Sequence, residues 1–262
     1  MAVTAIRSSL KGSRQMESYN EFAPFYDRFI RPVDYPARAR YFDALLKPML
    51  GEERLMLDLA CGTGSLSVEM ARLGYEVIGV DGSQEMLAYA QQKAYEADLP
   101  IRFFHQRMER LNLGGSVDCC ICALDSLNHI TESKNLRRAL MRVAAHLLSG
   151  GVFLFDLNTP YKHRMLLADH CYCYEDGDTL CIWQNHTEGL LTEIDLDFFT
   201  EQRDGKYLRT GESFAERGYE LDEIRGMLAE CGLDLIALYG GDTLLPPTEE
   251  TERWIFVTKK GE

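Results

Sequence analysis

The chain has 262 residues, of which 46% are hydrophobic, and its formal net charge at pH 7 is −13. This length and apolar content suffice for one large α/β domain with an insertion, and no apolar stretch approaches the ~20 residues needed to span a bilayer. The negative charge argues against long-lived binding to a phosphate backbone, so we expect neither a nucleic acid nor a membrane as the partner.

The first fifteen residues look extraneous to the fold. They contain Arg7, Lys11 and Arg14 and no acidic residue. Their apolar core is too short for a signal peptide, so we do not predict secretion. We expect disorder or a loose helix before about residue 16, where Met16 stands as a candidate first functional residue.

The segment 57–64, L-D-L-A-C-G-T-G, is the most informative part of the chain. The apolar residues at 55–59 predict a strand that is covered on both faces. Gly62 and Gly64 allow the backbone to turn sharply and to approach a ligand. Helical spacing follows at 65–73, so a ligand on this turn would lie at a helix N-terminus. The segment therefore predicts a site for a nucleotide-like ligand.

This turn differs from two well-known phosphate-binding loops. The dinucleotide fingerprint needs a third glycine where Ser67 stands, and no G-K-[ST] follows as in a P-loop. Asp58 is a second distinguishing feature, because an acid at the end of a buried strand must be paired or hydrogen-bonded. We expect Asp58 to accept hydrogen bonds from the N–H groups of the turn, and whether it also serves a ligand stays open.

A second apolar strand at 75–80 ends in Asp81. The spacing from the glycine turn is close to that at which a carboxylate binds ribose hydroxyls in Rossmann-like sites. A carboxylate suits this task because it can accept hydrogen bonds from two neighbouring hydroxyls. Ser83 is then expected to cap a helix over 84–90.

The next segments repeat the alternation of strands and helices. Strand-like sequences at 99–104 and 117–123 are followed by a helix at 136–148 and a strand at 152–158. In open α/β sheets, ligands bind beyond the carboxyl ends of the strands. The polar cluster after residue 123 is therefore placed to meet a ligand, and it comprises Leu124, Asp125, Ser126, Asn128 and His129.

The region 160–217 departs from this alternation. Four strand-like segments are separated by turn signals, and they lie at 171–175, 179–187, 191–201 and 207–215. In the third segment apolar and acidic residues alternate, which is typical of an antiparallel sheet with one wet face. We expect an inserted meander, followed by a helix at 219–231 and a closing hairpin of strands at 234–239 and 253–259.

Eight cysteines do not make a disulfide scaffold in a chain of this size. Cys119, Cys120 and Cys122 alternate between the faces of an expected buried strand, where free cysteine behaves as a small apolar residue. Reduced thiols in a cytoplasmic protein are the favoured interpretation. A zinc site near Cys171 and Cys173 is the weaker alternative, since the spacing matches no common zinc pattern, and we expect no metal.

The motif D-L-A-C-G-T-G at 58–64 resembles the first motif of class I S-adenosylmethionine (SAM)-dependent methyltransferases. The resemblance runs in unbroken order over 51–158 and includes an L-x-x-G-G-x-x-x-F-D transition that ends at Asp156. It implies an α/β fold, with a Rossmann-like, mostly parallel sheet of seven strands and helices on both faces, to which the antiparallel meander described above is added as an insertion.

The segment 19–28 resembles the Y-x-x-F-A-x-x-Y-D opening of a subset of small bacterial methyltransferases, which includes sugar-amine N,N-dimethyltransferases. In that subset the N-terminal helices fold over the SAM site as a lid. Tyr19 and Tyr26 are the candidates for an aromatic ring near the sulfonium, because ring faces attract cations. Tyr35, Arg38 and Tyr41 are weaker candidates, and the alternative for all five is helix packing.

The resemblance also implies contacts to the adenine ring. The residue at Met86 lies against the ring in the family, although packing of its helix is the alternative. The positions that match the adenine motif are Gln106, Arg107 and Met108, and the usual acid is absent at 107. Recognition of the adenine amino group then falls to a backbone carbonyl or to Gln106. The complete set of expected cofactor-binding residues is Tyr19, Tyr26, Asp58, Ala60, Cys61, Gly62, Thr63, Gly64, Asp81, Gly82, Ser83, Met86, Gln106, Arg107, Met108 and Leu124.

These expectations divide the chain into parts. Residues 1–15 are an extension, 16–50 a helical lid, 51–159 and 218–262 the SAM-binding domain, and 160–217 an inserted subdomain that covers the acceptor site. A dimerisation surface is the alternative role of the insertion, and a monomer or a homodimer is expected.

The implied activity is transfer of a methyl group from SAM to a small-molecule N- or O-nucleophile by in-line displacement. A general base is needed for a protonated amine or a poorly acidic hydroxyl. His129 is the first candidate, and Asp125 and then His186 follow. The alternatives are a non-catalytic SAM-binding protein or partner subunit and an NAD-linked oxidoreductase, which Asp58 and the missing third glycine disfavour.

Overall fold

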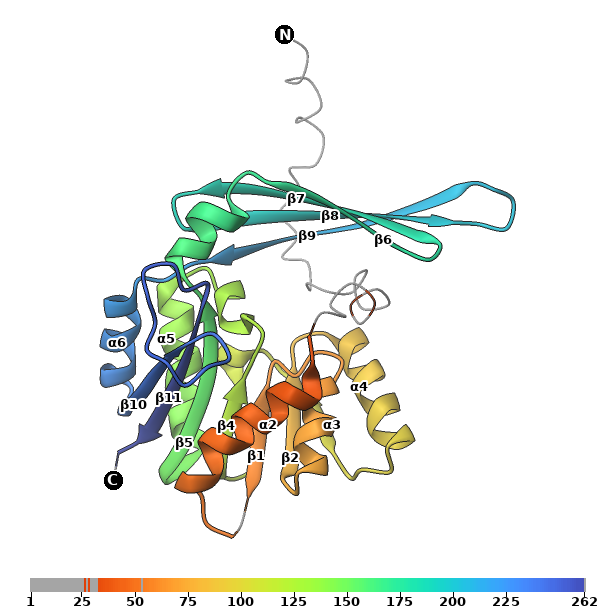
Figure 1. Cartoon of the computed structure of the whole chain (residues 1–262). Coiled ribbons are helices and arrows are strands. Elements are labelled where there is room, and N and C mark those ends of the chain that lie inside the picture. The colour runs from red at the N-terminus through yellow and green to blue at the C-terminus, as the bar shows by residue number, and fades with distance from the viewer. Residues whose placement is uncertain (1–25, 27, 29–32, 53, 262) are drawn as a thin grey trace.

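Two β-sheets dominate the part of the chain that the computed structural model describes, which is residues 26, 28, 33–52 and 54–261 (Figure 1). The larger sheet has seven strands in the order β10-β11-β5-β4-β1-β2-β3. Its neighbouring strands run parallel, except that β11 is antiparallel to both β5 and β10. The strands are β1 (Leu55–Leu59), β2 (Glu76–Asp81), β3 (Arg102–His105), β4 (Val117–Cys122), β5 (Leu147–Asn158), β10 (Leu233–Gly240) and β11 (Arg253–Lys260).

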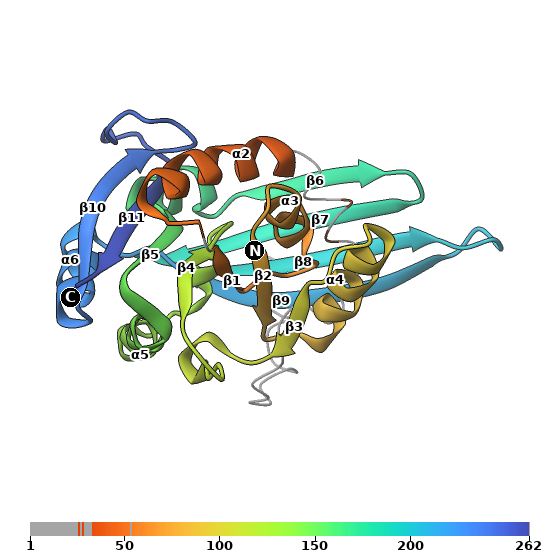
Figure 2. The same ribbon diagram turned by 90° about the horizontal axis from the view of Figure 1, so that it is seen from below.

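Helices cover both faces of this sheet, as Figure 2 shows from below. Helices α2 (Tyr35–Leu46) and α3 (Ser65–Arg72) pack on one face, and α5 (Ser133–His146) and α6 (Leu221–Glu230) pack on the other. Helix α4 (Gln84–Glu96) contacts α3, β2 and β3. The predicted α/β class, the seven strands and the closing hairpin are thus confirmed.

The ends of the helices follow from local sequence. Ser83 caps α4 as predicted, since its hydroxyl accepts a hydrogen bond of 3.2 Å from the backbone N–H of Met86. The helix runs beyond the predicted end at residue 90, because buried Ala90 and Ala94 continue its apolar face. Asp34 caps α2 in the same way by accepting from the N–H of Ala37.

The cysteines of β4 are buried on both faces of the main sheet. Cys119 and Ile121 face the side covered by α2 and α3, whereas Cys120 and Cys122 face the side covered by α5 and α6. All four side chains are fully buried. The eight cysteines are free, and burial raises the pKa of the Cys119, Cys120 and Cys122 thiols.

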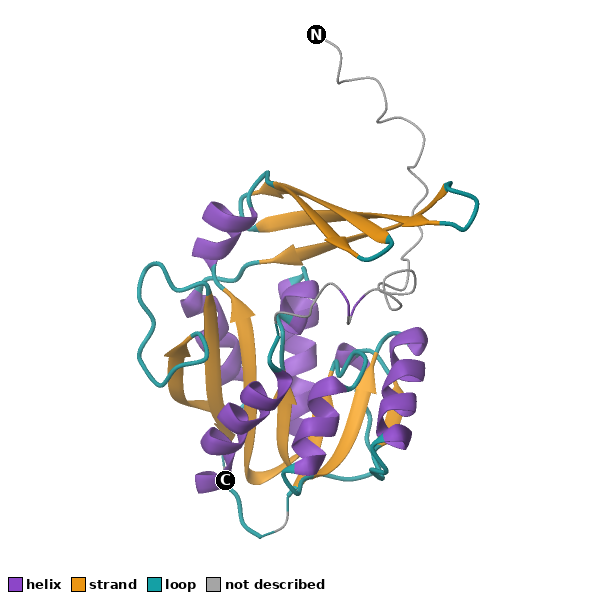
Figure 3. Ribbon diagram, turned by 45° about the vertical axis from the view of Figure 1, so that its right-hand side comes forward, coloured by secondary structure: helices purple, strands orange, loops and turns teal. Residues whose placement is uncertain are grey.

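The second sheet is the predicted antiparallel meander. It contains, in spatial order, β6 (Cys171–Asp176), β7 (Thr179–Glu188), β8 (Leu191–Glu201) and β9 (Tyr207–Arg217). It lies across the carboxyl ends of the parallel strands, as Figures 1 and 3 show. A π-helical segment, Lys162–Leu167, joins it to β5. Its inner face carries a small apolar cluster of Cys181, Ile194, Leu196 and Phe198.

Two described residues of the N-terminal region contact this second sheet. Tyr26 packs against the inner apolar cluster. Arg28 donates from Nε to Asp176 (2.8 Å) and from Nη2 to Asp178 (3.0 Å), so it ties the segment to the β6–β7 turn. The predictions for residues 1–15 and for Tyr19 lie outside the described residues. No helix among the described residues is long and apolar enough to cross a membrane.

The carboxylate of Asp156 near the end of β5 is fully buried and joins several elements. Its oxygens accept hydrogen bonds from the backbone N–H groups of Leu124 (2.9 Å) and Asp125 (2.6 Å). They also accept hydrogen bonds from Nη1 of Arg38 in α2 (3.1 Å) and from Nη1 of Arg253 in β11 (2.7 Å). Leu124 and Asp125 both have positive φ angles, 59° and 54°, so Asp156 stabilises a left-handed turn that few non-glycine residues adopt.

We predict that Asp156→Asn lowers the free energy of unfolding by about 3–5 kcal/mol, because Arg38 and Arg253 then lose the buried carboxylate that compensates their charge. Urea denaturation followed by circular dichroism measures this loss. Asp242→Asn is the matched control, since Asp242 pairs with the same Arg38 from an exposed position and should cost less than ~1 kcal/mol. Equal losses of unfolding free energy in the two variants would contradict a central role of Asp156 in stability.

Candidate functional site

A cavity of about 340 Å³ opens at the carboxyl ends of β1, β2 and β4. In open α/β sheets, ligands bind at the carboxyl ends of the strands where the strand order reverses. Here the order reverses at β1, which has β2 on one side and β4 on the other. The predicted site residues that line it are Tyr26, Ala60, Gly62, Asp81, Gly82, Ser83, Met86, Gln106, Arg107, Met108, Leu124 and His129. Ser126 of the predicted polar cluster lines it too, whereas the sequence analysis missed Glu109, Ile130, Thr131, Glu132 and, within α5, Asn135.

The glycine turn is held against β2 by its backbone. Cys61 donates its N–H to the carbonyl of Val80 (3.0 Å), and Gly62 donates its N–H to Oδ2 of Asp81 (2.8 Å). Gly64 has a φ of 74°, and a Cβ there would lie 2.8 Å from the Cβ of Ala90. Only glycine therefore lets α4 approach the turn this closely, and this approach brings Ser83 and Met86 to the cavity.

Asp58 lies near the end of buried β1 as expected, but its hydrogen-bond partner differs from the one expected. Its side chain lies behind the turn, only 2% exposed, and accepts a hydrogen bond from the hydroxyl of Ser67 in α3. Asp81, and not Asp58, accepts from the N–H group of the turn. The residue that breaks the dinucleotide fingerprint, Ser67, is thus the partner of the buried acid. Cys61, Thr63 and Gly64 are also absent from the described lining of the cavity.

Asp81 lines the cavity and anchors the glycine turn. Its Oδ1 accepts from the N–H of Ser83 (2.8 Å) while its Oδ2 accepts from Gly62. Each carboxylate oxygen retains capacity for a further donor, which two ribose hydroxyls can supply. Burial raises the pKa of Asp81, and the backbone hydrogen bonds from Ser83, Gly62 and Gly82 oppose that rise.

The three residues predicted to contact adenine through the segment after β3, Gln106, Arg107 and Met108, all line the cavity. Both groups of the Gln106 side-chain amide bind the backbone of Asn112, through Nε2 to its carbonyl (3.2 Å) and through Oε1 from its N–H (2.8 Å). Gln106 therefore stabilises its own loop while it lines the cavity, and both predicted alternatives for the adenine amino group remain predictions. Arg107 forms a long ion pair with Glu109 (3.9 Å), and Met86 and Met108 supply apolar walls.

The weaker N-terminal candidates have structural partners away from the cavity. Arg38 pairs with Asp156 and Asp242, and the hydroxyl of Tyr41 donates to the carbonyl of Thr243 (2.7 Å). Tyr35 packs with the apolar cluster beneath α2 and α3. Their role is the docking of α2 on the sheet. Tyr26 is the described aromatic residue of this region that reaches the cavity.

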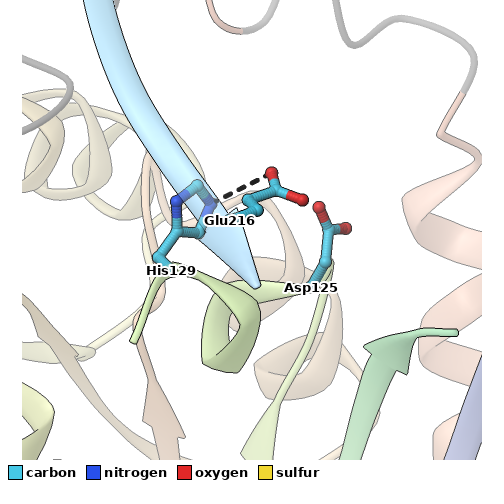
Figure 4. Close-up of side chains that lie close together, drawn as sticks. All are labelled: Asp125, His129 and Glu216. Atoms are coloured by element: carbon cyan, nitrogen blue, oxygen red, sulfur yellow. Dashed lines mark ion pairs between the residues drawn. The ribbon is translucent and has the colours of Figure 1, made fainter. Parts of the chain in front are cut away.

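After the end of β4, Asp125 and His129 meet Glu216 from the end of β9 in the inserted sheet (Figure 4). His129 lines the cavity, and its Nε2 lies 3.6 Å from Oε1 of Glu216. Burial lowers the pKa of His129, so its imidazole is largely neutral at pH 7. Its ring also packs against Phe214, at 5.2 Å between centroids.

Asp125 is a poor candidate for the base. Its Oδ1 accepts from Nη2 of Arg253 at 2.7 Å. Burial opposes ionisation of Asp125, but the nearby charges of Arg253 and Lys162 outweigh it and hold the pKa below its ordinary value. A carboxylate with a low pKa and a strong cationic partner is a weak proton acceptor. His129 is therefore the better of the two predicted bases.

Glu216 is a functional candidate that the sequence analysis missed, because the predicted strand ended at residue 215. Strand β9 runs on to Arg217, and its inward positions include Glu212 and Glu216, both buried. A glutamate at an inward position of an antiparallel sheet is unusual, and this feature of the sequence could have marked Glu216 as a functional candidate. Each of Asp125, His129 and Glu216 offers one oxygen or nitrogen atom of the kind that can bind a metal ion, and these three atoms lie within 4.8 Å of one another. Arg253 and Lys162 supply cationic charge beside them, which favours proton exchange over metal binding.

Comparison with known proteins identifies the class. Residues 56–151 match the family described as "Methyltransferase domain". A "Putative methyltransferase" of Geobacillus sp. (strain WCH70) is 35% identical over 247 residues, which cover 93% of this chain and 100% of that protein. The crystal structure of an S-adenosylmethionine-dependent methyltransferase from Clostridium acetobutylicum ATCC 824 superposes with a TM-score of 0.85 at 32% identity, covering 93% of this chain and 99% of that one.

A more narrowly named relative is the glycine/sarcosine N-methyltransferase of Parasynechococcus marenigrum (strain WH8102), 32% identical over 243 residues, with 87% of this chain and 81% of that protein covered. The chain belongs to the SAM-dependent methyltransferase family, and its fold is the Rossmann-like fold of that family. The cavity fits S-adenosylmethionine, since a Cβ built on Gly62 meets nothing within 4 Å and Asp81 offers acceptors beside it.

We predict that Asp81→Ala weakens SAM binding at least tenfold, because the ribose hydroxyls lose their carboxylate acceptor and the turn loses its anchor. Isothermal titration calorimetry measures the dissociation constant. Glu76→Ala serves as the matched control, since Glu76 is an exposed acid at the other end of β2. This control variant should bind SAM with the affinity of the wild type. An unchanged affinity of the Asp81 variant would show that the ribose site lies elsewhere.

Asp58 gives a prediction about pH. Burial raises its pKa to about 7, from an ordinary value of 3.8, although the Ser67 hydroxyl opposes the rise. The folded protein therefore keeps this proton to a higher pH than the unfolded chain, and stability falls as pH increases across that interval. Asp58→Asn should flatten this fall in melting temperatures recorded between pH 5 and 8 without ligand. A variant whose melting curve against pH parallels the wild type would contradict the raised pKa.

Proposed function

We propose that this methyltransferase methylates the nitrogen of a small-molecule amine, with His129 as the general base. The observation that carries this proposal is the position of the His129 imidazole at the cavity wall, beside Glu216 and Asp125. An amine is largely protonated at neutral pH and must lose a proton before its nitrogen can attack the methyl carbon, and a neutral imidazole can accept that proton. A hydroxyl acceptor is the second member of the predicted pair; the amine is favoured because two relatives named as N-methyltransferases each match more than four fifths of this chain.

Each part of the cavity has a task in the proposed reaction. SAM supplies an electrophilic methyl group on a sulfonium. Asp81 and the Gly62 turn bind and orient the nucleoside, and the wall of Met86 and Met108 excludes water from the adenine. Tyr26 presents an aromatic ring toward the cavity, where a sulfonium would be attracted to its face. Alignment of the nucleophile with the methyl carbon can supply roughly 7–11 kcal/mol of the barrier reduction.

The inserted sheet forms the cover of the proposed acceptor site. Its inner face carries Phe214 and Glu216 to His129, and Arg28 and Tyr26 connect it to the N-terminal segment. Residues from several elements would thus close around a small acceptor. Relatives named as N-methyltransferases agree with an amine, among them the glycine/sarcosine enzyme above and a dTDP-3-amino-3,6-dideoxy-alpha-D-glucopyranose N,N-dimethyltransferase of Streptomyces fradiae, 30% identical over 151 residues.

A direct test combines binding and turnover. Thermal shift with SAM, S-adenosylhomocysteine and NAD should show stabilisation by the first two only. Methyl-labelled SAM is then incubated with a panel of glycine, sarcosine, amino sugars and their hydroxyl analogues. Labelled product from an amine supports the proposal, and product from the hydroxyl analogues alone overturns it. Binding of SAM without any product across the panel and a metabolite extract would favour a non-catalytic SAM-binding protein or partner subunit.

We predict that His129→Asn lowers turnover of a methylated amine by roughly 10²–10⁴-fold, the usual contribution of a general base, while SAM affinity changes little. His186→Asn is the control, because His186 was also a predicted base but pairs with Asp169 on an exposed part of the inserted sheet. Steady-state rates with labelled SAM measure both variants. Equal turnover in the His129 variant and the wild type would remove His129 from the mechanism.

A further inference from the structure

We propose that Glu216 of the inserted sheet and His129 of the main domain share one proton and work as a single proton-accepting unit, in which Glu216 is the positioning residue. The inference rests on the proposed function and deepens it. It gives the inserted sheet a chemical task in addition to covering the site. The structure brings the two side chains together from segments that are far apart in the chain (Figure 4).

The carboxylate of Glu216 is held in a fixed orientation. Its Oε2 accepts from Nδ2 of Asn158 (3.3 Å), which leaves Oε1 facing Nε2 of His129. Asn158 is itself fixed, since its N–H donates to Oδ1 of Asn128 (2.9 Å) and its Oδ1 accepts from Nζ of Lys162 (3.0 Å). The orientation of Glu216 toward His129 is therefore imposed by the main sheet.

His129 is held from the other side. It ends the short 3-10 helix Ser126–His129, whose start is the left-handed turn bound by Asp156. Within the same helix, Asn128 is fully buried and donates to the carbonyls of Asn158 (3.3 Å) and Arg217 (2.8 Å). The helix that carries His129 is thus hydrogen-bonded to the end of the strand that carries Glu216. This link restricts the separation of the two side chains.

The charges that face this pair decide where its proton lies. Asp125, Lys162 and Arg253 surround it from three further elements. Burial and the charge of Asp125 together raise the pKa of Glu216 to about 8, against the opposing effects of Lys162, Asn158 and Arg253. Burial lowers the pKa of His129, which Asp125 partly offsets. At neutral pH the carboxyl therefore holds the proton and the imidazole is neutral, and the two groups titrate as a pair.

The proton transfer can be written with all atoms balanced. An ammonium acceptor gives one proton to the neutral imidazole, and the resulting imidazolium is stabilised once Glu216 has released its own proton to solvent. The nitrogen lone pair then forms the bond to the methyl carbon while the carbon–sulfur bond breaks and its electron pair stays on sulfur. Reprotonation of Glu216 and loss of the imidazolium proton restore the pair. The unit therefore accepts protons best above the pH at which Glu216 ionises.

The test is a titration of His129 by nuclear magnetic resonance of the full chain labelled with ¹⁵N in its imidazoles, with S-adenosylhomocysteine present. His129→Asn assigns the signal. We expect two steps in the wild type, one near pH 8 that reports ionisation of Glu216 and one below the ordinary histidine pKa. In Glu216→Gln the upper step should disappear. Glu193→Gln, an exposed glutamate on the outer face of the same sheet, should keep both steps.

The titration has clear outcomes. Loss of the upper step in Glu216→Gln alone supports the shared proton, and identical titrations of His129 in Glu216→Gln and wild type overturn it. Thermal unfolding gives a second readout, because the cost of ionising buried Glu216 should make the wild type lose more stability between about pH 4.5 and 8 than Glu216→Gln loses. The measurement needs no acceptor. A two-step titration together with a negative amine panel would therefore count against the proposed function and not against the pairing.

Discussion

The buried carboxylate of Asp156 is the interaction on which the site depends. Burying an ionised acid is costly unless it is paired and fully hydrogen-bonded, and here two arginines and two backbone N–H groups meet that need. The same contacts fix the left-handed turn after β4, dock α2, and orient Arg253 so that it binds Asp125. One side chain thus connects the stability of the domain with the position of the proposed base.

The two halves of the site are built in different ways. The proposed donor half consists of a backbone turn, one carboxylate and apolar walls, all contributed by consecutive elements from β1 to the 3-10 segment after β3. The proposed acceptor half is assembled from side chains that follow β4 or belong to β5, β9 and β11, and it is complete only after the second sheet has folded across the first. The donor half can therefore stay constant while changes in the inserted sheet alter the acceptor.

This difference explains how much could be predicted from sequence. The strands, the helices on both faces and the meander follow from local periodicity and turn residues, and the Ser83 cap was predicted correctly. The Asp58 prediction was wrong because two acids flank the same turn, and which of them binds its N–H group depends on the pairing of β1 with β2. The hydrogen bonds of the Gln106 amide to Asn112 could not be predicted, because they depend on the path of the loop after β3. Glu216 could not be recognised, since its importance arises from a contact with His129 that only the tertiary structure creates.

The most direct test of the account is a crystal structure with S-adenosylhomocysteine, because the central claim is geometric. We expect the ribose hydroxyls at the carboxylate of Asp81, the adenine between Met86 and Met108, and the sulfur directed toward His129 and Glu216 beneath the inserted sheet. A ligand whose sulfur points away from His129, or whose ribose is bound by another residue, would contradict the account.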